Sequence, residues 1–167
     1  MSHPVLGLPP ADPTAGLPDA ARRLRADRGR LASVALEQAV RRDPTLPERY
    51  DDLALRYLLR DYERHIEQLA QALETGEARF VTSYAEWLIP AYRRRHVPAR
   101  DLATLVEGLR DAAHGLLAPA EIEALDDLAA AWVARLRFHG RLPGDHKGNP
   151  VVRFIFKGAG IGDDSVV

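Results

Sequence analysis

A chain of 167 residues, 46% of them hydrophobic and 28% charged, is long and apolar enough for one globular domain with a sizeable core, which excludes global disorder. The 23 basic residues nearly balance the 24 acidic ones, giving a formal net charge of −1, and this balance argues against a nucleic-acid-binding scaffold. Cysteine is absent, which excludes disulfides, thiolate metal sites and a cysteine nucleophile. No apolar run reaches the ~18 residues that span a bilayer, so we expect a cytoplasmic protein without membrane or nucleic-acid partners.

The first 17 residues are rich in proline and poor in charge, and they lack the cationic start and apolar run of a signal peptide. We predict that residues 1–17 form a flexible arm. Pro18 suits the first turn of a helix, and the helical pattern continues to about Arg42, just before Pro44. Gly29 lies inside this first helix and marks the place for a bend or a break.

The second helix has a clear start signal. Thr45 followed by Glu48 is a capping-box pair, in which each side chain bonds to the other's backbone N–H group. Gly76 is a typical stop at the C-terminal end of a helix. The apolar residues between these signals recur at helical spacing and predict an amphipathic helix: Tyr50, Leu53, Tyr57, Leu58, Tyr62, Ile66, Leu69 and Leu73.

Three more helices are predicted before residue 140. The third, over residues 78–95, contains Pro90, which has no N–H group and clashes with the preceding turn, so we expect a kink or a division there. The fourth covers residues 98–117, and the fifth begins with Pro119 and ends near His139. We predict that the fourth and fifth helices form a long antiparallel pair.

A change in composition follows Gly140. Residues 141–167 form a Gly/Pro-rich tail, in which residues 151–156 alternate like a β-strand, with Val152, Phe154 and Phe156 on one face. A single short strand cannot satisfy its own backbone, so it must pair with a partner, lie in a groove or stay mobile. We therefore predict an all-α fold, globin-like or a helical bundle, with about five helices in residues 18–140 and a short β-like tail.

The sequence contains no recognisable catalytic or metal-binding motif. The histidines lack the spacing of known zinc or di-iron ligand sets, and Asp61 with His65 is an i, i+4 pair of the kind that is usually a simple contact. The serines lack the context of an activated nucleophile. We therefore predict neither an enzyme nor a metal site.

Two groups of residues suggest binding. Arg93, Arg94 and Arg95 are adjacent and could hold an anion, although cations at a helix end are also typical of a solvated terminus. Aromatic side chains concentrate in the second and third helices, where they form either core or the lining of a pocket for a flat ligand: Tyr50, Tyr57, Tyr62, Tyr84, Trp87 and Tyr92.

The segment from Ala91 to Val97, with a long helix before it and two long helices after it, resembles the proximal region of bacterial sensor globins over about residues 49–139. In that family one helix supplies the proximal haem ligand and a long helix then forms a dimer. Tyr92 stands where the proximal histidine is expected, and the non-haem members of the stressosome type lack this ligand altogether. The resemblance implies a globin-like core.

Three hypotheses follow. The first is a non-catalytic sensory or adaptor module that signals as a homodimer through helices 98–117 and 119–139. The second, implied by the resemblance, is a globin that binds haem or another tetrapyrrole, with Tyr92 or His114 as axial ligand. Its pocket would be lined by Tyr62, His65, Tyr84 and Trp87. The third is a cargo or scaffold protein that docks a partner by strand addition through tail residues 150–156.

Overall fold

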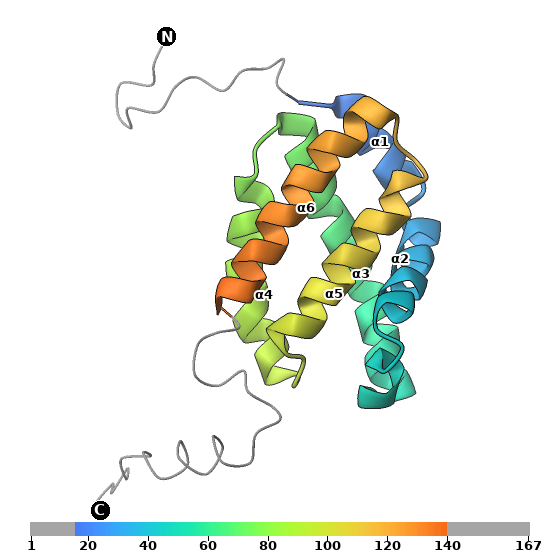
Figure 1. Ribbon diagram of the computed structural model, residues 1–167, viewed down its shortest axis with the longest axis vertical. Coiled ribbons are helices and arrows are strands. Elements are labelled where there is room, and N and C mark those ends of the chain that lie inside the picture. Colours follow the sequence, from blue (N-terminus) through green and yellow to red (C-terminus); the bar gives the residue numbers. More distant parts are fainter. Residues whose placement is uncertain (1–15, 140–167) are drawn as a thin grey trace, which may run out of the picture.

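The computed structural model describes residues 16–139, which are helical throughout apart from short connections and contain no strand (Figure 1). This confirms the all-α prediction for the described part of the chain. The predicted tail, including Val152, Phe154 and Phe156, lies outside the described residues, as does the arm up to residue 15. Within residues 16–139 the elements are α1 (Pro18–Ala26), α2 (Arg28–Arg42), the 3-10 turn η1 (Leu46–Arg49), α3 (Asp52–Thr75), α4 (Arg79–Arg94), α5 (Ala99–His114) and α6 (Pro119–His139).

The helix expected over residues 18–42 is two helices, so residues 16–139 hold six α-helices and not about five. The break lies at Asp27, two residues before Gly29. Asp27 leaves helical geometry (φ −106°, ψ 20°) and joins the end of α1 to the start of α2. Aspartate has a low helix propensity, and at the end of α1 its backbone N–H donates to the Arg23 carbonyl oxygen, while its side chain makes no capping hydrogen bond to α2.

The start predicted for the second helix at Thr45 is wrong. The Thr45 hydroxyl donates to Asp43 Oδ1 at 2.6 Å, and residues 46–49 form only the 3-10 turn η1. The long helix α3 begins after Asp51, whose carboxylate accepts a hydrogen bond from the Ala54 N–H at 2.7 Å. The predicted end is confirmed, since Gly76 closes α3 in the left-handed region (φ 71°).

Five of the helices form a closed ring around the core. In the order α2, α5, α6, α4 and α3, each helix packs against the next, and α3 returns to α2, while α1 lies against α3. Figure 1 shows α6 and α5 side by side, with α4 beyond α6 and α2 beyond α5. α4 runs through Pro90 as one helix, with the proline exposed on its outer side. No helix among residues 16–139 is long and apolar enough to cross a membrane.

Ten of the sixteen residues of α5 are buried. Gly108 lies so close to α2 that a Cβ atom there would stand 2.6 Å from the Ala35 carbonyl oxygen and 2.7 Å from the Ala39 nitrogen. The side chains of α5 that reach the surface are polar or charged, because its apolar ones pack inside the ring. The homodimer expected through helices 98–117 and 119–139 stays a prediction, and the large hydrophobic side chain exposed on these two helices is Phe138 of α6, at 61%.

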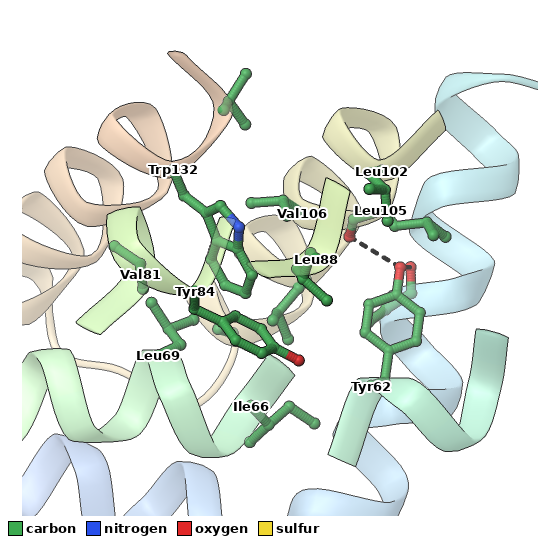
Figure 2. Close-up of a cluster of buried hydrophobic side chains, with 14 of the residues drawn as sticks. Tyr62, Ile66, Leu69, Val81, Tyr84, Leu88, Leu102, Leu105, Val106 and Trp132 are labelled. Atoms are coloured by element: carbon green, nitrogen blue, oxygen red, sulfur yellow. Dashed lines mark hydrogen bonds between the residues drawn. The ribbon is translucent and has the colours of Figure 1, made fainter. Parts of the chain in front are cut away.

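Large side chains from four helices meet inside the ring. Trp132 of α6 and Tyr62 of α3 are fully buried, and Tyr84 of α4 lies against Trp132 (Figure 2). The Tyr62 hydroxyl donates to the Leu105 carbonyl oxygen of α5 at 2.8 Å, the bond drawn in Figure 2. A buried hydroxyl needs such a partner, so this bond holds α3 and α5 in one register.

A buried carboxylate fastens the turn before α3 to the start of α5. Asp101 is 1% exposed, and both of its oxygens accept from Arg49 at 3.1 Å, while Tyr50 donates its hydroxyl to Oδ2 at 2.5 Å. Asp43 also accepts from Arg49, at 2.6 Å, and this bond is the main reason that the pKa of Asp43 falls to about 2. The network fixes the position from which α3 departs.

Candidate functional site

His65 of α3 is the one imidazole in the centre of the described core. It is 2% exposed and lies among four aromatic rings, whose centroids are 5.7–6.0 Å from its own. Tyr62 comes from the same helix, Tyr84 and Tyr92 come from α4, and Trp132 comes from α6. Burial of a group that can carry charge is costly, so the hydrogen bonds of His65 decide how it is tolerated.

These hydrogen bonds have a definite direction. Tyr92 donates its hydroxyl proton to Asp61 Oδ2 at 2.7 Å, and Arg95 Nη1 donates to the same oxygen at 2.5 Å. The Tyr92 oxygen, 3.1 Å from His65 Nε2, must therefore accept the proton of Nε2. A neutral imidazole has one N–H, so Nδ1 accepts from the Tyr84 hydroxyl at 3.0 Å. A single chain of hydrogen bonds thus runs from Tyr84 through His65 and Tyr92 to Asp61.

The electrostatics agree with this chain. Burial lowers the pKa of His65 from its ordinary 6.5 to about 4; nearby Asp61 opposes the shift, while Arg64 and Arg95 add to it. Burial also raises the pKa of Tyr84 and Tyr92 above the ordinary value of a phenol. The imidazole is therefore neutral and both hydroxyls are protonated near neutral pH, as the directed chain requires.

Directly outside these hydrogen-bonded side chains, α3, α4 and the residue after α4 present a surface that we call the aromatic–arginine face: Leu53, Tyr57, Arg60, Arg64, Trp87 and Arg95. The four residues of α3 are spaced i, i+4, i+7 and i+11, so they lie along one side of that helix. Leu53, Tyr57 and Trp87 are 57%, 47% and 54% exposed. These are three of the four large hydrophobic side chains that are exposed among the described residues.

Cations and rings contact each other on the aromatic–arginine face. The guanidinium carbon of Arg64 lies 5.6 Å from the Trp87 ring centroid, and that of Arg95 lies 5.7 Å from Tyr57 and 4.8 Å from Tyr92. Trp87 also stacks on Tyr84, with centroids 5.8 Å apart and an angle of 14° between the rings. The surface and the buried chain are therefore in direct contact through Tyr84 and Tyr92.

The turn after α4 places Arg95. Its backbone N–H and that of Val97 both donate to the Tyr92 carbonyl oxygen, at 3.0 and 2.9 Å, which ends the helix tightly. Between them His96 takes up the left-handed region (φ 62°), a conformation uncommon for a residue other than glycine. The chain thus reverses just where Arg95 can reach back to Asp61 on α3.

The structure brings together five of the six residues predicted to bind a cofactor. Tyr62, His65, Tyr84 and Tyr92 meet in the core, and Trp87 covers Tyr84 from outside. Their rings are already in contact with one another, so a tetrapyrrole would have to separate them before it could bind. Tetrapyrrole binding stays a prediction.

His114 lies apart from that group, at the end of α5. Its Nε2 is 2.7 Å from Asp126 Oδ1 of α6, an ion pair when the imidazole is protonated. This contact joins the two helices of the predicted antiparallel pair. It gives His114 a local partner on α6, away from Tyr92 and the chain around His65.

The three arginines of the predicted anion site do not occupy equivalent positions. Arg95 turns back onto Asp61 and the rings of Tyr57 and Tyr92, whereas Arg93 and Arg94 are exposed in the last turn of α4. Anion binding by the three arginines stays a prediction.

Sequence reasoning named Tyr57, Trp87 and Arg95 as candidate binding residues, but it missed Leu53, Arg60 and Arg64 and did not bring the six together as one face. Leu53 and Tyr57 belong to the apolar pattern of the predicted second helix, yet both are exposed. Arg60 and Arg64 continue their row along α3, and this spacing, read together with the two exposed residues, is the signal that could have shown the face.

A separate groove lies along α2. An open groove of about 550 Å³ runs between α2 and α3 and is lined by Ser33, Leu36, Glu37, Val40, Arg41 and Leu59. Leucine and valine side chains form its apolar part, with charged side chains beside them. Its size is within the range of small-molecule sites, but it is open along its length.

Among residues 16–139, no three His, Cys, Asp or Glu side chains are grouped so that they could hold a metal ion. Comparison with protein-family models, with curated proteins and with solved structures found no match to the chain. We therefore infer function from the geometry alone.

Proposed function

We propose that the protein is a non-catalytic adaptor or sensory module that binds a protein partner through the aromatic–arginine face. The supporting observation is the exposure of Trp87 and Tyr57 beside Arg64 and Arg95, at cation–π distances. Tryptophan, tyrosine and arginine are the residues that dominate binding energy at protein interfaces. A cluster of all three, held by local contacts on one face, is the composition expected of a docking surface.

The energetic reason is the amount of apolar area left in water. Covering a large apolar side chain contributes about 1.5–3 kcal/mol. Trp87 and Tyr57 are each about half exposed, so a partner that covers both gains on the order of 2–3 kcal/mol from burial alone. Guanidinium groups add cation–π attraction, which grows when water is excluded.

The core beneath the face makes it rigid. Tyr84 and Tyr92 of α4 bond to His65 and Asp61 of α3, so α3 and α4 cannot slide without breaking a buried chain of hydrogen bonds. A preorganised surface loses little conformational entropy on binding, which favours affinity. The buried imidazole therefore serves to position the face; being enclosed, it has no access to a substrate.

Affinity capture from a cell extract tests the proposal with two matched variants. The first combines Trp87→Ala with Tyr57→Ala on the aromatic–arginine face. The second is Phe138→Ala on α6, which removes an equally exposed aromatic side chain elsewhere. We expect a partner to be retained by the wild type and by Phe138→Ala. Its affinity for the double variant should fall by about 30-fold or more, because the two residues together contribute about 2 kcal/mol or more.

Circular dichroism provides the folding control. Both variants change exposed side chains, so their helical spectra should match that of the wild type. The proposal is wrong if the same partners bind the double variant with unchanged affinity, or if Phe138→Ala is the variant that loses them.

A further inference from the structure

The aromatic–arginine face has a direction along α3. Its apolar residues, Leu53 and Tyr57, come first, and its arginines, Arg60 and Arg64, follow one and two turns later. At 1.5 Å per residue the row from Leu53 to Arg64 is about 16 Å long, which is about three turns of a helix. A partner that matches the row must therefore be apolar at one end and charged at the other.

The arginines of the row are not neutralised within the described structure. Neither Arg60 nor Arg64 forms an ion pair with any residue between 16 and 139, and as an i, i+4 pair of like charges they repel each other. Asp61, the carboxylate that Arg95 of the face contacts, is already bonded to Arg95 and Tyr92. The face therefore carries an excess of positive charge, although the whole chain has a net charge of −1.

The apolar half of the face distinguishes between two kinds of anionic partner. A nucleic-acid backbone would satisfy Arg60 and Arg64 but would leave Leu53 exposed. The Trp87 ring, which could stack on a base, already has Tyr84 and Arg64 against it. A protein segment that carries both carboxylates and apolar side chains covers the whole row.

From these observations, and resting on the function proposed above, we infer that the partner docks an acidic amphipathic helix onto the aromatic–arginine face. Two carboxylates one helical turn apart on that helix pair with Arg60 and Arg64. An apolar side chain one or two turns further on covers Leu53 and Tyr57. The i, i+4 spacing of the arginines favours a helix, since its own side chains recur at the same interval.

Fluorescence anisotropy with the full-length protein tests this inference. The probes are two labelled amphipathic peptides of about 18 residues, with leucines on one face and either glutamate or glutamine at two positions one turn apart. A labelled single-stranded oligonucleotide is the third probe. We expect the glutamate peptide to bind about tenfold more tightly than the glutamine peptide at low salt, and the difference to shrink as salt is added.

Paired charge variants locate the effect. Arg60→Gln with Arg64→Gln should abolish the preference for glutamate. Arg28→Gln with Arg30→Gln changes the net charge equally at exposed positions on α2, where neither arginine has an ion pair among residues 16–139, and should leave the preference intact.

Several outcomes would overturn the inference: no binding of the glutamate peptide up to about 1 mM, equal affinity for both peptides, equal effects of the two charge variants, or tighter binding of the oligonucleotide. These failures are separable from a failure of the docking face itself. If Trp87→Ala with Tyr57→Ala still eliminates capture of a partner while glutamate and glutamine peptides bind alike, the face stands and the acidic helix is wrong.

Discussion

His65 should make the stability of the protein depend on pH in a range where few other groups titrate. In the folded protein burial lowers the pKa of His65 to about 4, whereas in the unfolded chain it returns to about 6.5. At pH values between 4 and 6.5, the histidine is protonated in the unfolded chain and neutral in the folded protein. The free energy of unfolding is therefore unaffected by His65 above about pH 6.5 and falls as the pH decreases from 6.5 toward 4.

The size of the effect follows from the two pKa values. A difference of ~2.5 pH units corresponds to about 3 kcal/mol in total. Between about pH 7.5 and pH 4.5 the loss is about 2.5 kcal/mol, since most of the transition of the unfolded histidine is complete by then. This is a large share of the 5–15 kcal/mol by which domains are usually stable.

The carboxylates that also stabilise the folded protein act at lower pH. Asp43, Asp111 and Glu121 have lowered pKa values, so their stabilisation is present above their ordinary pKa and is lost mainly below about pH 4.5. The variant His65→Gln removes the imidazole but retains an amide donor and acceptor. Any carboxylate contribution is common to both proteins and cancels in their difference.

Urea unfolding, followed by circular dichroism at a series of pH values, measures the effect. We expect the free energy of unfolding of the wild type to fall by about 2.5 kcal/mol more than that of His65→Gln between about pH 7.5 and pH 4.5. A flat wild-type curve over this range, or the same slope in the variant, would refute the neutral, buried imidazole and the hydrogen-bond direction derived from it.

Two further predictions concern the packing of α5. Gly108→Ala should destabilise the protein by about 1–3 kcal/mol, because the new Cβ would collide with the α2 backbone. Gly29→Ala, with open space around it, should be neutral or stabilise the protein by up to about 1 kcal/mol. Thermal unfolding measures both variants, and equal effects would contradict the close packing of α2 and α5. Asp101→Asn should lower the free energy of unfolding by about 3 kcal/mol, because it leaves the Arg49 guanidinium without its buried counter-charge. Asp127→Asn, on the exposed side of α6, should lower it by less than ~0.5 kcal/mol. Urea unfolding at neutral pH measures both, and similar losses would show that the Asp101 network contributes little.

Local signals in the sequence were enough for much of the helical framework. α6 begins at Pro119 as predicted, and Gly76 ends α3, because proline and glycine act on the backbone within one turn. The same reasoning failed at Thr45. Its hydroxyl donates to Asp43 and accepts from Arg49, so it does not cap a helix.

The candidate site shows where local reasoning stops. The hydrogen bonds around His65 join residues that are far apart in the sequence. Tyr84 and His65 are 19 positions apart, and Asp61 and Arg95 are 34 positions apart. Only the packing of α4 against α3 brings each pair together. Helical spacing places Leu53, Tyr57, Leu58 and Ile66 on one long helix but does not say which of them faces the core. That choice depends on which sides of α3 the other helices cover.

By itself, therefore, the sequence determined an all-helical chain within residues 16–139 and most of its helix ends, since these depend on periodicity and on the backbone limits of single residues. The tertiary structure alone decided that most of α5 is buried, that tyrosines pack around His65, and that Tyr57 and Trp87 remain in water beside arginines. The physical reason is that burial is a property of neighbours brought together by folding, and it sets both the protonation of His65 and the exposure of the aromatic–arginine face.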